Sequence, residues 1–295
     1  MKNISVIGGG TMGNGIAHVF AQSGYNVTLI DIKQEMLDKA ISTITKNMDR
    51  LISKERLTED EKNAALSRLK TTTQLAEGVS NADLVVEAAT ENVNIKLQLF
   101  RDIDASAPAH AILASNTSSI SITKIASVTG RPEKVIGMHF MNPVPVMKLV
   151  EVIEGFKTDK NVTETIFELS KKLGKVPALT QDYPGFIANR ILMPMINEAI
   201  ISLHEGVAEV EEIDTIMKLG MAHPMGPLQL ADFIGLDVCL AILNVLHDGL
   251  GNPKYAPCPL LVNMVTSGDL GVKSGRGFYD YSHGSKELVV APNFK

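Results

Sequence analysis

Residues 3–15, NISVIGGGTMGNG, decide the fold of this chain, because they join a short apolar strand, a glycine-rich turn and the start of a helix. The glycines Gly8, Gly10 and Gly13 have the spacing G-x-G-x-x-G, and a second apolar run, NVTLID, ends eighteen residues later at Asp31. The glycine spacing alone is a weak signal. Strand, turn, helix and acidic residue together are typical of a βαβ unit that binds a dinucleotide.

Each part of this unit has a physical role in holding a pyrophosphate. The first glycine permits the tight turn, the second lets phosphates approach the backbone, and the third lets the helix pack close to the sheet. The free N–H groups and the positive dipole end at the helix start favour negative charge. The residues predicted to hold the pyrophosphate are Gly8, Gly10, Thr11, Met12 and Gly13.

Asp31 bears on the choice of cofactor. Its carboxylate would accept hydrogen bonds from a ribose 2′-hydroxyl and would repel a 2′-phosphate. Lys33, two residues later, carries a positive charge that would attract a 2′-phosphate. The sequence therefore predicts NAD, with NADP as the less favoured alternative.

Short β patterns alternate with helical patterns in the first half of the chain, and this alternation predicts an α/β domain with a mostly parallel sheet of the Rossmann type. Thr58 is predicted to be the N-terminal cap of the helix at 58–69. The strands are predicted at 3–8, 26–31, 82–88, 111–116, 134–140 and 148–155, and the helices at 12–24, 34–54, 58–69 and 94–107.

The second half of the chain is helical in pattern, and β-branched runs nearly vanish from it. The turn residues Asp182-Tyr183-Pro184-Gly185 mark the boundary. The sequence predicts two domains: residues 1–183 bind NAD, and residues 184–295 form an all-helical domain.

Composition limits the possible functions. The chain has 28 Lys and Arg against 33 Asp and Glu, a net charge of −5, which argues against nucleic-acid binding. No apolar run is long enough to span a membrane, and no His/Cys cluster has metal-ligand spacing. Cys239 and Cys258 are the two cysteines. We expect both thiols to be reduced in a cytoplasmic protein without a metal site.

His139 and Glu151 are the strongest candidates for chemistry. A lone histidine or glutamate at a strand end is more often structural, but these two are symmetric about Pro145. If the chain reverses around NPVPV, the two strands run side by side and the carboxylate lies near the ring. Such a carboxylate would fix the tautomer and stabilise the imidazolium that forms when the histidine takes a proton from an alcohol.

The chain resembles the 3-hydroxyacyl-CoA dehydrogenase family over essentially its whole length, most closely the bacterial 3-hydroxybutyryl-CoA dehydrogenases. The motifs that carry this resemblance are VIGGGTMGNGIA, ADLVVEAATENVNIK, LASNTSSISIT, GMHFMNPVPVMKLVEV, PGFIANRIL, HPMGPLQLADFIGLD and KSGRGFYDY. The resemblance implies a stand-alone oxidoreductase of fatty acid and butanoate metabolism that interconverts an (S)-3-hydroxyacyl-CoA and a 3-oxoacyl-CoA. A four-carbon substrate is expected.

The resemblance also implies roles for individual residues. His139 is the general acid/base, Glu151 is its partner, and Ser118 and Asn189 hold the 3-oxygen and the acyl carbonyl region of the substrate. The cofactor contacts implied beyond the glycine loop are Asp31, Glu91, Lys96, Ser118, Asn142 and Lys273.

A basic helix after the second strand is the candidate site for coenzyme A. Lys46, Arg50 and Lys54 recur every four residues and share one helical face, with Arg56 close behind. The same pattern also occurs on ordinary solvated helix surfaces. For the C-terminal domain, rich in Leu, Ile and Met, the resemblance implies a homodimer interface.

Two other functions fit the same sequence less well. One is a dehydrogenase of a free hydroxy acid or sugar acid, which would not need the basic helix. The other is a non-catalytic dinucleotide-binding protein that keeps the fold. The joint presence of Ser118, His139, Glu151 and Asn189 argues against the second alternative.

Overall fold

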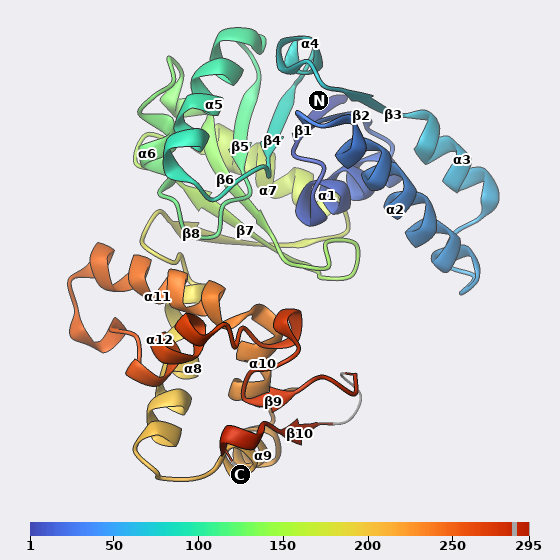
Figure 1. Ribbon diagram of the computed structural model, residues 1–295. Helices are drawn as coiled ribbons and strands as arrows, with labels where there is room; N and C mark the ends of the chain where they lie inside the picture. The colour runs from blue at the N-terminus through green and yellow to red at the C-terminus, as the bar shows by residue number, and fades with distance from the viewer. Residues whose placement is uncertain (285–287, 295) are drawn as a thin grey trace. The chain divides into compact units, whose positions relative to one another are not determined.

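The computed structural model describes residues 1–284 and 288–294, and it divides the chain into two compact units. Unit 1 is Met1–Tyr183 and unit 2 is Pro184–Lys295. Figure 1 shows the eight-stranded sheet of unit 1 and the helices of unit 2.

One eight-stranded sheet organises unit 1, in the order β3-β2-β1-β4-β5-β6-β7-β8. Every neighbouring pair is parallel except β6 and β7, which run antiparallel. The central strands are buried on both faces, which explains their continuous apolar runs. The strands are β1 (Asn3–Ile7), β2 (Asn26–Ile30), β3 (Leu69–Thr72), β4 (Leu84–Glu87), β5 (Ile112–Ser115), β6 (Val135–Phe140), β7 (Leu149–Glu154) and β8 (Val176–Gln181).

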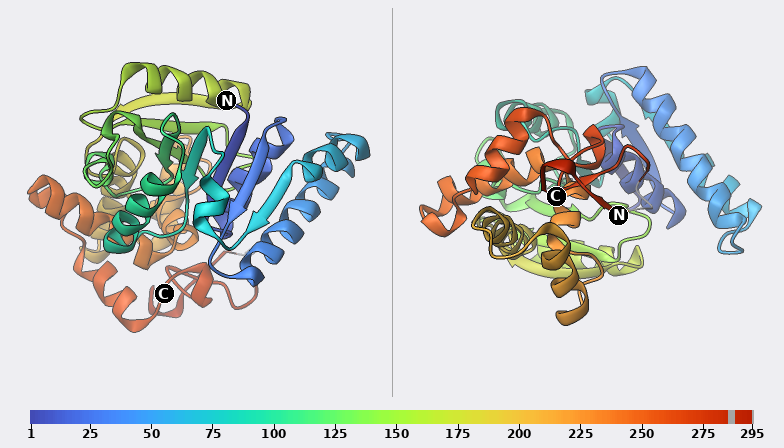
Figure 2. Two further views of the ribbon diagram at one scale, coloured as in Figure 1. Left: turned by 90° about the horizontal axis from the view of Figure 1, so that it is seen from above. Right: turned by 60° about the horizontal axis from the view of Figure 1, so that its bottom comes forward.

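Helices cover both faces of this sheet (Figures 1 and 2). One face packs against α1, α2, α3 and α7 around a core that includes Ile16, Phe20 and Ile166, and the other packs against α4, α5 and α6. The bounds are α1 (Thr11–Gln22), α2 (Gln34–Ile52), α3 (Glu59–Ser67), α4 (Leu75–Val79), α5 (Val93–Ser106), α6 (Ile122–Ala126) and α7 (Lys160–Lys172). Thr58 caps α3 in a capping box with Glu61, as its position predicts.

The mostly parallel sheet and the helical second unit are confirmed, but some elements were not foreseen. The edge strands β3 and β8 escape prediction because LKTT is short and polar and VPALTQ contains Pro177, a residue that an edge strand tolerates. The prediction of an all-helical second domain is wrong in one detail. Unit 2 contains a small antiparallel sheet of β9 (Tyr279–Asp280) and β10 (Val289–Val290), two residues each and too short for a periodic signal.

Unit 2 is otherwise a helical bundle around its own apolar core, which includes Ile196, Leu228 and Leu243. Cys239 is buried in α11, and Cys258 is the buried N-cap of α12. The helices are α8 (Ala188–His204), α9 (Val210–Thr215) continued by a π-helical turn (Ile216–Gly220), α10 (Pro227–Ile234), α11 (Leu236–Leu250) and α12 (Pro259–Ser267).

Hydropathy places a limit on membrane insertion. Within residues 1–284 and 288–294, no single helix is long and apolar enough to cross a bilayer. The helices α10 and α11 reach the required length and apolarity only as a pair, and they meet at an angle of 97°.

Candidate active site

The glycine loop between β1 and α1 is compact on one side and open on the other. Gly8 has φ = +104°, and a Cβ there would lie 2.5 Å from the carbonyl oxygen of Ala88. A Cβ at Gly13 would lie 1.7 Å from the carbonyl oxygen of Gly8, so the helix start packs directly on the turn. At Gly10 a Cβ would meet no atom within 4 Å. The loop therefore has the tight turn and the open approach that a pyrophosphate needs.

Asp31 lies just after β2 and steadies this loop. Its carboxylate oxygens accept hydrogen bonds from the backbone N–H of Gly9 at 2.7 Å and of Lys33 at 3.0 Å. Asp31 also lines a mostly apolar cavity of about 810 Å³ that includes Ile32 and Ile95. Apolar walls beside a carboxylate suit a planar base with its ribose, so the residues present fit a dinucleotide.

His139 and Glu151 are brought together by the antiparallel pairing of β6 and β7. The reversal predicted around Pro145 is confirmed, because His139 stands directly opposite Glu151 in the register. The ring Nδ1 and the carboxylate Oε2 are 2.7 Å apart, and both residues are buried. This contact fixes the orientation of the imidazole and sets a negative charge against one of its nitrogens.

The loop after β5 carries Ser118, and the loop after β4 carries Glu91. The backbone N–H of Ser118 donates to Glu91 Oε1 at 2.9 Å, and the hydroxyl of Thr117 donates to Glu91 Oε2 at 2.8 Å. The structure thus places two predicted site residues in contact. Thr117, which the sequence did not single out, is the second anchor of Glu91.

Lys96, predicted to contact the cofactor, is fully buried in unit 1. Its ammonium is buried in α5 and forms an ion pair with Glu87 at the end of β4. Glu87 in turn accepts hydrogen bonds from the backbone N–H of Ala89 at 2.9 Å and from the hydroxyl of Ser115 at 2.8 Å. This buried network connects the ends of β4 and β5 and so fixes the loops that follow them. A direct contact of Lys96 with the cofactor stays a prediction.

Two grooves run between α2 and the segment that links β6 to β7. The first, about 280 Å³, is lined by Asn142 together with Gly10 and Thr11 of the glycine loop. The second is about 420 Å³, and we call it the basic groove. Its lining residues are His18, Asn47, Arg50, Leu51, Lys54, Arg56, Pro143, Pro145 and Val146.

The predicted basic helix contributes to this groove only in part. Arg50, Lys54 and Arg56 line it, whereas Lys46 is exposed and is not among its lining residues. Asn47 lines both grooves and was missed. Its signal was weak, because an uncharged residue does not stand out among the lysines and arginines of a helix.

Two predicted site residues, Asn189 and Lys273, belong to unit 2. Asn189 lies in the first turn of α8. Lys273 forms an ion pair with Asp237 near the start of α11. Their approach to a substrate or cofactor stays a prediction.

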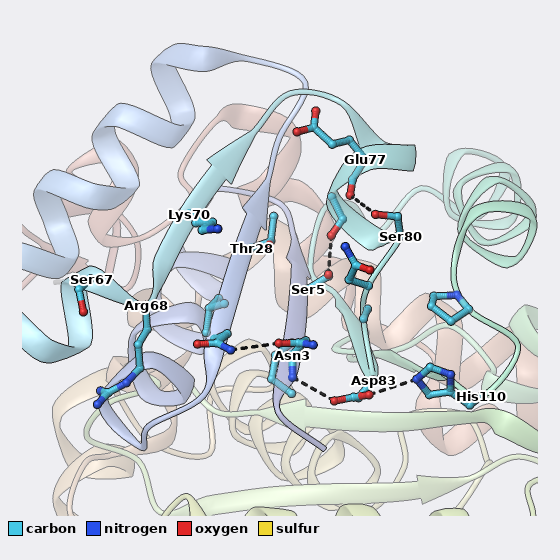
Figure 3. A pocket seen from close by; sticks show the side chains of 17 residues that line it. Asn3, Ser5, Thr28, Ser67, Arg68, Lys70, Glu77, Ser80, Asp83 and His110 are labelled. Carbon is cyan, nitrogen blue, oxygen red and sulfur yellow. Dashed lines mark hydrogen bonds and ion pairs between the residues drawn. The ribbon is translucent and has the colours of Figure 1, made fainter.

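A further polar pocket of about 560 Å³ lies at the amino ends of β1, β2 and β3 (Figure 3). Some of its polar groups bond to one another: the Ser5 hydroxyl donates to the carbonyl of Gly78 at 2.6 Å, and His110 lies 3.1 Å from the Asp83 carboxylate. In open α/β sheets, ligands bind at the carboxyl ends of the strands, where the glycine loop, Glu91 and Ser118 lie. The chemistry is therefore assigned to that opposite edge.

The sheet, the glycine loop and the buried His–Glu pair define an α/β oxidoreductase that binds a nicotinamide dinucleotide. Residues 3–183 match the model of the 3-hydroxyacyl-CoA dehydrogenase NAD-binding domain, and residues 185–281 match that of the C-terminal domain. The chain belongs to the 3-hydroxyacyl-CoA dehydrogenase family, and the resemblance seen in the sequence is confirmed.

Individual relatives agree over nearly the whole chain. A 3-hydroxybutyryl-CoA dehydrogenase of Bradyrhizobium diazoefficiens is 53% identical over 95% of this chain and 96% of its own. A probable 3-hydroxybutyryl-CoA dehydrogenase of Deinococcus radiodurans is 56% identical over 94% and 99%. The crystal structure of (S)-3-hydroxybutyryl-CoA dehydrogenase from Ralstonia eutropha superposes with a TM-score of 0.93 at 50% identity, covering 96% and 99%.

Proposed function

We propose that this chain interconverts (S)-3-hydroxybutyryl-CoA and acetoacetyl-CoA with NAD, and that His139 is its general acid/base. The observation that carries the proposal is the buried contact of 2.7 Å between His139 Nδ1 and Glu151 Oε2. The names of the relatives support the substrate, and the full set of site motifs supports the reaction class.

The proposed reaction divides its tasks among the residues of this chain. When bound, the nicotinamide supplies the hydride acceptor. With Nδ1 directed to Glu151, the opposite ring nitrogen of His139 takes the hydroxyl proton during oxidation and returns it during reduction. Glu151 compensates the positive charge that the ring gains in that step. Ser118 and Asn189 are proposed to hold the substrate oxygens.

Asp31 supports NAD over NADP in this proposal. Its carboxylate lies beside the apolar cavity, already bonded to two backbone N–H groups, so a 2′-phosphate would meet negative charge there. Lys33 also lines that cavity, and its charge would moderate the preference without reversing it.

The first test is an assay of acetoacetyl-CoA reduction at 340 nm, with NADH and NADPH in parallel. Fast turnover with NADH and slow turnover with NADPH is expected. Comparable rates with both would reject the role of Asp31 but keep the reaction. Activity with free hydroxy acids, and none with acetoacetyl-CoA, would favour the alternative substrate class.

The acid/base role is tested by His139→Gln. Its kcat should fall by about 10²- to 10⁴-fold, while NADH binding measured by fluorescence stays unchanged. His204→Gln, at the exposed end of α8, is the matched control and should keep full activity. An active H139Q variant would refute the proposal.

The role of the carboxylate is tested by Glu151→Gln. Because the variant lacks the negative charge that favours the imidazolium, the rising limb of the pH profile of kcat/KM should move to lower pH.

We also propose that unit 2 carries a homodimer interface. Ile191, Ile216 and Leu219 expose apolar side chains on its helices, with Leu219 82% exposed. Exposed apolar side chains of this size can take part in an interface with a second copy of the chain. Light scattering should report a dimer, and Leu219→Lys should weaken it, whereas a monomeric unchanged protein would refute the assignment.

A further inference from the structure

Lys175, between α7 and β8, is a buried lysine that the proposed reaction does not use. It is 8% exposed, and its ammonium donates hydrogen bonds to the carbonyl oxygens of Val144 at 2.5 Å and Met147 at 2.8 Å. Within residues 1–284 and 288–294, no carboxylate lies within ion-pair distance of it. Burial lowers the pKa of its amino group. A buried ammonium held by carbonyls alone is costly, and a methionine would fill similar space without that cost.

The segment that Lys175 holds is the turn between β6 and β7, residues 141–148. Inside it, the backbone N–H groups of Val146 and Met147 both donate to the carbonyl of Pro143 at 2.9 Å. On its α1 side, the turn presses against Gly15, where a Cβ would lie 2.9 Å from that of Val144. The Lys175 ammonium donates hydrogen bonds to two other carbonyls of this turn, those of Val144 and Met147. The turn is therefore held at two places, by its packing on α1 and by these hydrogen bonds.

The position of this turn matters for three parts of the proposed site. It connects the strands that bring His139 and Glu151 together. It supplies Asn142 to the groove beside the glycine loop, and it supplies Pro143, Pro145 and Val146 to the basic groove. A shift of the turn would therefore move a wall of both grooves.

The charge of Lys175 reaches the basic groove as well. His18, which lines that groove, has its pKa lowered mainly by burial, and the nearby ammonium of Lys175 adds to the effect. Arg50, Lys54 and Arg56 offer exposed charges, which salt screens, whereas a buried charge is screened much less. Lys175 thus adds a positive charge behind the wall of the groove.

We propose that Lys175 is a positioning residue that clamps the β6–β7 turn and, through its buried charge, favours the phosphate-bearing part of a coenzyme A thioester in the basic groove. The inference rests on the proposed function, because it assumes that the groove receives coenzyme A. It predicts a selective loss: a substrate with phosphates should depend on Lys175 more than one without.

The test compares two thioesters in Lys175→Met. Acetoacetyl-CoA carries the nucleotide and its phosphates, and acetoacetyl-N-acetylcysteamine does not. The KM for acetoacetyl-CoA should rise about tenfold, as expected for one charge acting through a partly buried medium, with a much smaller change for the truncated thioester. Hydrogen–deuterium exchange of the peptide covering 141–149 should become faster. The matched control is Lys172→Met, an exposed lysine at the end of α7, which should change neither readout.

The outcomes distinguish two hypotheses. In the first, Lys175 both fixes the turn and attracts the phosphates of coenzyme A; in the second, it only stabilises the fold. Equal losses for both thioesters, or unchanged exchange in the turn, would overturn the proposal. If K175M does not fold, Lys175→Gln decides, because it keeps a hydrogen-bond donor and removes the charge. A selective rise in the KM for acetoacetyl-CoA in K175Q supports the proposal, and an unchanged ratio of the two KM values overturns it. Inactivity of the unchanged protein would instead refute the proposed function, and the exchange measurement would still test the clamp.

Discussion

In unit 1, the buried carboxylates of Glu87 and Glu151 each face a nitrogen base, Lys96 in one case and His139 in the other. In unit 2, the buried carboxylates of Asp214 and Asp232 face neutral donors. Asp214 accepts from the backbone N–H groups of Leu228 and Gln229 and from the hydroxyl of Tyr279. Asp232 accepts from the N–H groups of Phe278 and Tyr279 and from the hydroxyl of Tyr281.

The difference shows two ways of burying an acid. At Glu87 a cation faces the carboxylate and favours its charged form, and removal of the cation would leave an uncompensated buried charge. Neutral donors satisfy the oxygens but leave the negative charge desolvated, and burial raises the pKa of Asp232 to about 6. Burial and the nearby carboxylates also raise the pKa of Tyr279 and Tyr281, so both hydroxyls remain donors. The Glu87 site should therefore be sensitive to mutation of its partner, and the Asp232 site to pH.

Removal of the cation from the unit 1 pair should have the largest effect on stability. Lys96→Met leaves Glu87 charged, buried and uncompensated, and should lower the free energy of unfolding by about 3–5 kcal/mol. Urea denaturation followed by circular dichroism measures this loss. The double variant Glu87→Gln, Lys96→Met should recover much of it, and Lys124→Met, an exposed lysine of α6, serves as the control. A K96M loss no greater than that of the control would show that Glu87 does not depend on charge for its burial.

The next largest effect is the pH dependence of unit 2. The folded pKa of Asp232, about 6, lies above its ordinary value of 3.8, so the protonated form is favoured in the folded state. Its contribution to stability is fully present below pH 4 and is lost as the pH rises through 6. The loss amounts to roughly 3 kcal/mol, because each tenfold difference in proton affinity between the folded and unfolded states corresponds to about 1.4 kcal/mol.

Urea denaturation between pH 4 and 8 tests this sign. The chain has five tyrosines and no tryptophan, and three of the tyrosines (Tyr255, Tyr279 and Tyr281) lie in unit 2, so tyrosine fluorescence reports mainly on that unit. Asp232→Asn should be less stable than the unchanged protein at pH 4 but should lack this part of the pH dependence. A wild-type curve that runs parallel to that of D232N would contradict the assignment.

A smaller effect is expected from one neutral donor. Tyr281→Phe removes the hydroxyl that lies 3.1 Å from Asp232 Oδ2, and should lower stability by about 1.5 kcal/mol at neutral pH, where the carboxylate is charged. The loss should shrink at pH 4, and the pKa of Asp232 should rise further. Tyr25→Phe in unit 1 is the control. An equal loss at both pH values would mean that the hydroxyl contributes packing alone.

The sequence predicts the parts of this molecule that depend on local order along the chain. The glycine loop, the capped helix at Thr58 and the reversal that pairs His139 with Glu151 are each encoded within a stretch of about fifteen residues. The carbonyl clamp of Lys175 joins segments 31 residues apart. The pair of Glu87 and Lys96 spans only 9 residues, but no periodicity indicates that a lysine and a glutamate there are both buried. No motif in the sequence marks Asp214 or Asp232 as buried, and only the packing of the segment from Phe278 to Tyr281 against them reveals their burial.

The smallest effect is expected where charges stay in water. On α7 of unit 1, Lys171 donates to Glu168 at 2.7 Å, with the two side chains 53% and 61% exposed. Glu168→Gln should change the free energy of unfolding by less than about 0.5 kcal/mol, because solvent and salt screen the pair and ordering two long side chains offsets its attraction. The change should vanish in about 1 M salt, whereas the loss in K96M should persist there, because a buried pair is screened much less. If E168Q lowered the free energy of unfolding as much as K96M does, burial would not explain why one charged pair matters more than the other. The comparison of the buried carboxylates, which rests on burial, would then need another cause.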